Sequence, residues 1–239
     1  MSMISGTTDY ADMSEADLVI EAVFENMAVK KDVFTKLDEV CKQGAILASN
    51  TSSLDLDEIA AFTKRPEDVI GLHFFAPANV MTLLEIVRGE KTAKDVIATS
   101  MALAKTIRKI GVLVGVCFGF VGNRMFFPYV REAQLMLLEG VSAERIDKVA
   151  FDWGMAMGPN SVLDLSGLDV FNKLNSEWKD RPDDPAYYRV CNVLVEMQRF
   201  GQKTGRGMYI YEGRNAEADP EVAEIAAKEA KTLGIEPRE

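Results

Sequence analysis

Several of the signals that identify common classes of protein are absent from this sequence of 239 residues. It contains one histidine and three cysteines, which stand far apart with no Cys-x-x-Cys spacing: Cys41, Cys117 and Cys191. A disulfide scaffold and a zinc site are therefore not expected, and the cysteine pattern indicates a reducing compartment. No apolar run approaches the roughly 18 residues that a transmembrane helix needs.

Basic side chains are outnumbered, since 27 Lys and Arg stand against 37 Asp and Glu and leave a net charge of −10. The electrostatic field of this negative charge repels phosphate backbones and anionic lipid, so neither a nucleic acid nor a membrane is an expected partner. The start of the sequence lacks the charged and apolar regions of a signal peptide, and its end lacks a Ser-Lys-Leu address. We therefore expect a cytoplasmic location.

The catalytic and nucleotide-binding motifs that depend on glycine are missing as well. The sequence contains no Gly-x-Gly-x-x-Gly, no P-loop and no Gly-x-Ser-x-Gly elbow, and a His-Glu-x-x-His helix is impossible with a single histidine. No metal site is therefore expected, and any imidazole base must be His73.

The first half of the chain alternates between short apolar runs and segments with helical spacing. Strands are predicted at residues 17–23, 45–48, 69–74, 83–87 and 112–114, and helices at 28–41 and 92–110. Alternation of this kind is typical of βαβ units, with a mainly parallel sheet and helices on both of its faces. Ligands of such sheets bind at the carboxyl ends of the strands.

The second half has helical spacing with hardly a strand. Helices are predicted at residues 121–140, 142–153, 161–177 and 184–200, and a last one opens at Pro220. The expected fold is therefore an α/β, partial Rossmann-like domain with a doubly wound sheet over residues 1–117. An all-α C-terminal domain is expected to follow over residues 118–239.

His73 and Glu85 form the most specific candidate pair. His73 stands near the end of a predicted strand, and Glu85 interrupts an apolar run in the next one. An ionised carboxylate is costly there without a partner, which favours a His-Glu dyad for acid-base chemistry. The alternative is a polar residue that caps a strand and a glutamate that faces water.

Two polar segments lie at positions where a ligand would bind. Residues 49–53, Ser-Asn-Thr-Ser-Ser, follow a strand and suit either a small polar ligand or the cap of the next helix. Residues 119–124 open a helix at the proposed domain boundary. The sequence favours either backbone N–H groups and Asn123 that face a cleft, or simply a tight helix entry.

Taken together and in order, six short segments resemble the L-3-hydroxyacyl-CoA dehydrogenase family of fatty-acid β-oxidation. They are Glu-Ala-Val-Phe-Glu-Asn at 21–26, Ala-Ser-Asn-Thr-Ser-Ser at 48–53, Gly-Leu-His-Phe-Phe at 71–75, Leu-Glu at 84–85, Gly-Phe-Val-Gly-Asn-Arg at 119–124 and Met-Gly-Pro at 157–159. Residues 201–209 resemble a segment of the multifunctional β-oxidation proteins, in which this dehydrogenase is fused to an enoyl-CoA hydratase.

The resemblance implies an NAD-dependent oxidation of the 3-hydroxyl of an L-3-hydroxyacyl-CoA to a ketone. It makes His73 the base and Glu85 its orienting carboxylate, and it places Ser52 and Asn123 against the substrate. The residues that it places around the NAD cofactor are Val23, Phe24, Glu25, Lys30, Asn50 and Ser52.

The sequence also departs from the family. Relatives begin with a βαβ unit that carries the Gly-rich turn, and the sequence starts after it, so a truncated Rossmann-like domain and weak cofactor binding are expected. Ala76 stands where relatives commonly carry Asn. A non-catalytic acyl-CoA-binding or assembly module is therefore an alternative, with a homodimer formed through the helical domain or through an exposed strand edge at residues 18–23.

Overall fold

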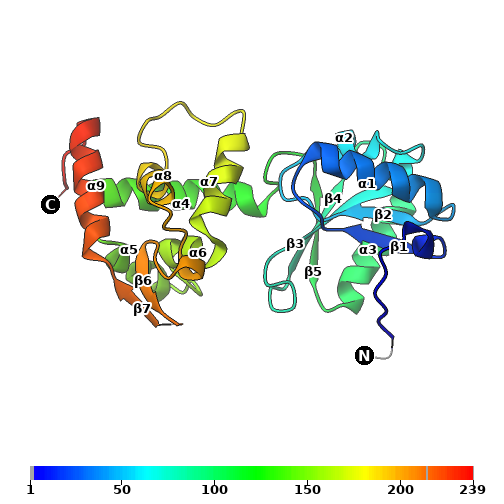
Figure 1. Ribbon diagram of the computed structural model, residues 1–239, viewed down its shortest axis with the longest axis horizontal. Coiled ribbons are helices and arrows are strands. Elements are labelled where there is room, and N and C mark those ends of the chain that lie inside the picture. Colours follow the sequence, from blue (N-terminus) through cyan, green and yellow to red (C-terminus); the bar gives the residue numbers. More distant parts are fainter. Residues whose placement is uncertain (1–2, 214, 239) are drawn as a thin grey trace. The chain divides into compact units, whose positions relative to one another are not determined.

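A computed structural model describes residues 3–213 and 215–238 of the chain. These residues form two compact units, Met1–Arg124 and Met125–Glu239, which are coloured from blue to green and from green to red in Figure 1. The division falls in the first turn of helix α4 (Gly122–Leu138), and the boundary expected after residue 117 stays a prediction.

The first unit contains a five-stranded sheet in the order β1-β2-β3-β4-β5. Its strands are β1 (Leu18–Glu21), β2 (Ile46–Ser49), β3 (Val69–Phe74), β4 (Leu83–Arg88) and β5 (Ile110–Gly115). All neighbours are parallel except β3 and β4, so the predicted mainly parallel sheet is confirmed. Within residues 3–213 and 215–238, no strand pairs with the outer edge of β1.

Helices cover both faces of this sheet (Figure 1). The helical elements of the unit are η1 (Tyr10–Met13), α1 (Met27–Val40), α2 (Leu56–Ala60), η2 (Pro66–Asp68) and α3 (Lys94–Thr106). One core cluster joins α1 and α2 to side chains such as Leu47 and Val69, and the other joins α3 to Ile46 and Ile70. Successive strand residues thus alternate between the two cores, as the pleat requires.

Helix α1 shows how local sequence sets these elements. The Asn26 side chain accepts hydrogen bonds from the N–H groups of Ala28 and Val29, which caps the first turn. Val33 and Leu37 then recur four residues apart and are buried against the sheet. Helix α1 covers residues 27–40, one residue away at each end from the predicted range of 28–41.

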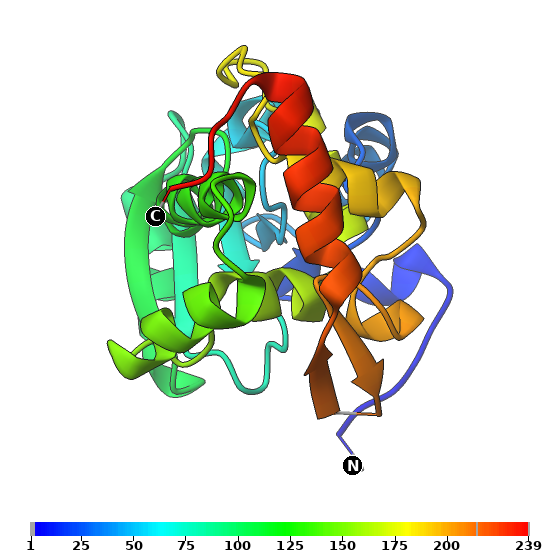
Figure 2. The same ribbon diagram turned by 90° about the vertical axis from the view of Figure 1, so that its left-hand side faces the viewer.

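The second unit is helical, as predicted, with a small added hairpin. Its elements after α4 are α5 (Ala143–Asp152), α6 (Pro159–Ser166), α7 (Leu168–Glu177), α8 (Arg189–Glu196), η3 (Gln202–Thr204), β6 (Tyr209–Glu212), β7 (Asn215–Ala218) and α9 (Pro220–Leu233). Figure 2 shows α9 rising from the hairpin and passing α8. Among the helices of the described chain, none is both long and apolar enough to cross a bilayer.

Two predicted helices of this unit are divided or shortened. The helix expected over 161–177 breaks at Gly167, whose φ of +96° is costly for residues with a side chain. The helix expected over 184–200 is reduced to α8, because Tyr188 at φ +56° and Gln198 at φ +60° leave the helical region. Asp164 ties the hairpin to α6 by accepting hydrogen bonds from the N–H groups of Met208 and Tyr209.

Gly71 packs closely against β4, and we predict that Gly71→Ala destabilises the protein. A Cβ at this position would lie 2.6 Å from the Cβ of Val87, its partner across the two strands. We expect the free energy of unfolding to fall by about 1–3 kcal/mol in urea denaturation. Gly115→Ala is the matched control, because a Cβ there meets no atom within 4 Å. Equal stability of the two variants would contradict the prediction.

Candidate active site

The functional candidates of the first unit gather at the carboxyl ends of β1, β2 and β3. Glu21 ends β1, Asn50 follows β2, and His73 lies one residue before the end of β3. The Asn50 side chain accepts a hydrogen bond from the Phe74 N–H at 2.8 Å, which joins the end of β2 to that of β3. This edge is where parallel sheets present their ligand-binding loops.

The register of β3 and β4 brings His73 and Glu85 together. The two residues are direct partners in this antiparallel pair, so their side chains share one face of the sheet. His73 Nδ1 lies 2.7 Å from Glu85 Oε2, and the two residues are 4% and 1% exposed. The glutamate therefore does not face water.

The second oxygen of Glu85 binds the start of α4. Glu85 Oε1 accepts hydrogen bonds from the N–H groups of Val121 at 2.9 Å and Gly122 at 2.8 Å. Burial raises the pKa of Glu85, but the bonds from His73 and from these two N–H groups outweigh it, so the pKa lies below its ordinary value. The carboxyl group is thus held ionised beside the imidazole.

Aromatic rings enclose the imidazole. The ring centroids of Phe75 and Phe120 lie 4.5 and 5.6 Å from that of His73. Gly122 packs against Phe75, because a Cβ on it would lie 2.8 Å from the Phe75 ring. These contacts hold the ring in a largely apolar setting.

Glu25 organises the polar loop that follows β2. Its Oε1 accepts hydrogen bonds from Thr51 Oγ1 at 2.6 Å, from the Ser52 N–H at 2.7 Å and from the Ser53 N–H at 3.2 Å. Burial raises the pKa of Glu25, but the Thr51 bond, the charge of Lys30 and the Ser52 N–H together lower it below its ordinary value. Ser52 itself is half-buried beside this carboxylate.

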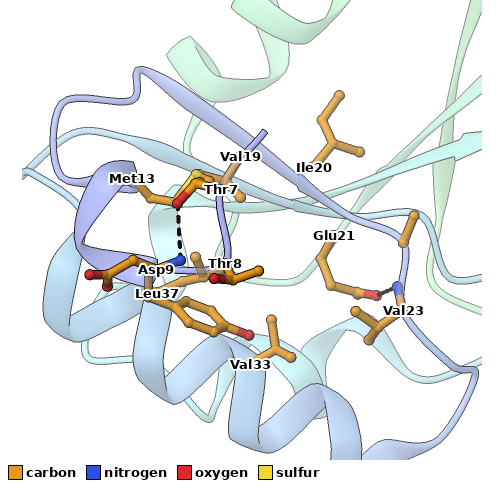
Figure 3. Close-up of a pocket in the computed structure, with 12 residues that line it drawn as sticks. Thr7, Thr8, Asp9, Met13, Val19, Ile20, Glu21, Val23, Val33 and Leu37 are labelled. Atoms are coloured by element: carbon orange, nitrogen blue, oxygen red, sulfur yellow. Dashed lines mark hydrogen bonds between the residues drawn. The ribbon is translucent and has the colours of Figure 1, made fainter. Parts of the chain in front are cut away.

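The remaining predicted residues are dispersed around this edge. Val23 and Phe24 are 43% and 81% exposed, whereas Lys30 is buried at 1% and pairs with carboxylates. Val23 and Glu21 line a pocket of about 480 Å³ beside β1, where Figure 3 shows them joined by a hydrogen bond. Asn123 lies in the first turn of α4, directly after the amide held by Glu85.

Sequence reasoning missed one carboxylate of the site, Glu21. Glu21 is 4% exposed and accepts hydrogen bonds from Lys30 and from the Ser49 hydroxyl. The signal was available, because Glu21 follows an apolar run just as Glu85 interrupts one. Backbone N–H groups of residues 119–124 were expected to face a cleft, but nothing in the sequence marked Glu85 as the acceptor of the Val121 and Gly122 N–H groups.

Comparison with known proteins gives matches over most of the chain. Residues 1–117 match the family described as 3-hydroxyacyl-CoA dehydrogenase, NAD binding domain, and residues 119–211 match that described as 3-hydroxyacyl-CoA dehydrogenase, C-terminal domain. The peroxisomal bifunctional enzyme of Homo sapiens is 47% identical over 97% of this chain and 34% of its own length. The glyoxysomal fatty acid beta-oxidation multifunctional protein of Brassica napus is 40% identical over 99% of this chain and 33% of its own length.

Solved structures agree with these matches. The (S)-3-hydroxybutyryl-CoA dehydrogenase of Ralstonia eutropha has a TM-score of 0.82 at 35% identity, over 88% of this chain and 76% of that one. The dehydrogenase part of multifunctional enzyme 1 from C. elegans has a TM-score of 0.64 at 34% identity, over 97% of this chain and 53% of that one. The chain spans about a third of the length of the curated relatives it matches.

The expected cytoplasmic location is wrong. The curated relatives are named as peroxisomal or glyoxysomal enzymes. The expectation rested on the lack of a signal peptide and of a Ser-Lys-Leu end in the given sequence, together with a cysteine pattern that speaks only against a disulfide framework. Cys41, Cys117 and Cys191 are free. Such a pattern does not separate the cytosol from an organelle.

We predict that Glu85→Gln destabilises the protein at neutral pH and that the difference from the unchanged protein shrinks in acid. The pKa of Glu85 is lower in the folded chain than in the unfolded one, so the carboxylate stabilises the fold above about pH 4.3. This contribution is lost as the pH falls through the folded pKa. Urea denaturation should give a difference of about 1–3 kcal/mol at neutral pH.

Glu217→Gln is the control for this measurement, because Glu217 is exposed on β7. It should leave the free energy of unfolding almost unchanged across the same range. A deficit of Glu85→Gln that stays constant down to strongly acidic pH would refute the role assigned to its charge.

Proposed function

The chain belongs to the 3-hydroxyacyl-CoA dehydrogenase family, and we propose that it oxidises the 3-hydroxyl of an L-3-hydroxyacyl-CoA to the ketone with NAD⁺. The observation that carries the proposal is the buried pair of His73 and Glu85, with 2.7 Å between Nδ1 and Oε2. A peroxisomal or glyoxysomal location accompanies this proposal, because the curated relatives are named for those organelles.

In this proposal His73 is the general base. Its Nδ1–H donates to Glu85, which leaves Nε2 as the atom that takes the proton of the substrate hydroxyl. The ionised carboxylate then stabilises the imidazolium that forms. When bound, the nicotinamide of NAD⁺ supplies the acceptor for the hydride that leaves C3.

The carboxyl ends of β1 and β2 fit the riboses and the flat ring of this cofactor. Val23 and Phe24 offer exposed apolar surface beside the pocket of about 480 Å³. Glu25 is partly exposed and ionised, and a carboxylate of this kind accepts hydrogen bonds from ribose hydroxyls. Asn50 lies at the same edge, after β2.

Ser52 and Asn123 are the proposed substrate contacts. The Ser52 hydroxyl belongs to the loop held by Glu25, and Asn123 belongs to the helix start held by Glu85. Each of the two polar groups is therefore fixed through a buried or half-buried carboxylate. An amide side chain in this position donates to the oxygen that becomes the ketone.

We predict that His73→Gln abolishes most of the activity. The unchanged protein should reduce NAD⁺ when L-3-hydroxybutyryl-CoA is added. The near-ultraviolet absorbance of the NADH that forms measures the rate. Removal of the general base should lower kcat by about 10²- to 10⁴-fold. Lys36→Ala is the control, because Lys36 forms an exposed ion pair with Asp32 on α1 and its other contact is with the Tyr10 ring.

A folded, unchanged chain that fails to reduce NAD⁺ would refute the proposal. The protein would then be read as an acyl-CoA-binding or assembly module. If the His73→Gln variant retains full activity, the proposed oxidation stands, but the role assigned to His73 and Glu85 is wrong.

We further propose that the helical unit forms a homodimer through an apolar patch between α4 and α5. The patch comprises Met136, Val149, Trp153 and Met155 and contains a hollow of about 310 Å³. Trp153 is 83% exposed and Val149 is 62% exposed, an exposure that indicates a partner surface. We choose a second copy of this chain as the partner because the family resemblance implies association through this unit.

We predict that Val149→Ser together with Trp153→Ser dissociates this dimer without unfolding the protein. Light scattering over a range of concentrations should give the mass of a dimer for the unchanged chain and that of a monomer for the double variant. Leu165→Ser is the control, because Leu165 is 55% exposed but lies on α6, outside the patch. A monomeric unchanged chain would contradict the proposal.

A further inference from the structure

A lysine side chain joins the segment before β5 to the loop between β3 and β4. Lys109 Nζ lies 2.5 Å from the carbonyl oxygen of Ala78 and 2.6 Å from that of Met81. The lysine stands 31 and 28 residues after these acceptors, so the contact links parts of the chain that are distant in sequence. Hydrogen bonds from an ammonium group are charge-assisted and stronger than those between neutral groups.

The two acceptors belong to one tight turn, the 77–81 turn. The Pro77 carbonyl accepts hydrogen bonds from the N–H groups of Val80 at 2.9 Å and Met81 at 3.0 Å, which closes the backbone of this turn. Residues 76–82 are all exposed, so packing contributes little to their order. The conformation of the turn therefore depends on its own hydrogen bonds and on those from the ammonium group.

The backbone of Lys109 is itself fixed at the end of α3. Its N–H donates to the Ala104 carbonyl at 2.7 Å, after Arg108 has turned the chain at φ +59°. The next residue, Ile110, begins β5 and donates its N–H to the Thr82 carbonyl at 2.8 Å. The lysine side chain thus reaches the turn from a backbone that is held on both sides.

The 77–81 turn adjoins the aromatic ring that packs against the imidazole. Phe75 lies between the end of β3, whose last residue donates its N–H to Asn50, and the turn. The centroid of the Phe75 ring is 4.5 Å from that of His73. The backbone that carries this ring is therefore held by the sheet on one side and by the turn on the other.

We infer that Lys109 is a positioning residue, which fixes the 77–81 turn and, through Phe75, holds the His73 ring in the geometry for proton transfer. The consequence for catalysis rests on the proposed function, whereas the effect on the ring does not depend on it. Without the ammonium group the turn loses two of its hydrogen bonds, and Phe75 loses its support on that side.

The first experiment records the NMR signals of the imidazole ring in the free protein, which are assigned directly because the chain contains one histidine. The ring current of Phe75 shifts the signals of the His73 ring protons, since the two rings are in contact. Lys109→Met should move these signals toward their positions in Phe75→Leu. Lys109→Arg should restore them, because its guanidinium also donates to two carbonyl oxygens.

Amide hydrogen exchange of the turn is measured on the same samples. Lys109→Met should speed the exchange of the Val80 and Met81 N–H groups, because the turn that they close opens more often. Lys109→Gln keeps neutral donors on a shorter side chain, so it replaces Lys109→Met where that variant fails to fold, and it should shift both readouts in the same direction.

Lys105→Met is the matched control, because it removes the same charge from an exposed lysine in the last turn of α3. It should leave the His73 signals and the exchange of the turn unchanged. Unchanged His73 signals in Lys109→Met, or an equal shift in Lys105→Met, would overturn the inference.

The second experiment compares turnover of these variants with L-3-hydroxybutyryl-CoA. Lys109→Met should lower kcat about tenfold, because the imidazole is displaced from the geometry of proton transfer, and should leave the KM for NAD⁺ unchanged. A raised KM for the acyl-CoA with unchanged kcat and unchanged His73 signals would mean that Lys109 binds the substrate directly, and would overturn the inference. An unchanged chain that reduces no NAD⁺ would refute the proposed function, while the NMR experiment would still test the placement of His73.

Discussion

The structure depends on one constraint, that a carboxylate removed from water must be surrounded by donors. Glu21 and Glu85 satisfy it in the first unit, and Asp147 and Asp164 satisfy it in the second, all of them at 7% exposure or less. Each draws its donors from segments distant in sequence, so each fixes a loop or a helix start to a strand or a helix. The same electrostatic requirement that makes these residues costly to bury makes them effective anchors.

The fold of the first unit could be predicted because its signals are local. The helix over 28–41 and the five strands follow from apolar spacing and from residues such as Asn26 and Gly44 at helix ends. The second unit was harder, since the break at Gly167 and the loss of helix before Arg189 depend on packing around the chain. The hairpin of β6 and β7 depends on Asp164, which lies 45 residues before Tyr209 and carries no mark of that partnership.

Part of the candidate site could likewise be predicted from local signals in the sequence, and part could not. Glu85 stood out because it interrupts an apolar run, and the register of β3 with β4 then placed it opposite His73. Glu21 carries the same signal, because it lies within the predicted strand at 17–23, but it was not singled out as a candidate. The N–H groups of residues 119–124 were expected to face a cleft. The bonds from Val121 and Gly122 to Glu85 could not be predicted, because any residue other than proline supplies an N–H.

Contacts within the protein link three residues of the candidate site. Glu25, Lys30 and Ser52 lie on three different segments, and the contacts connect them in the order Lys30, Glu25, Ser52, from the buried interior outward. The outer members, Glu25 and Ser52, are partly exposed, whereas the Lys30 side chain is 1% exposed and pairs with Glu21 and Glu25. Selection for cofactor binding would constrain all three equally, since moving the innermost group displaces the outer ones. The geometry of the accessible groups therefore depends on donors and acceptors that are buried within the protein.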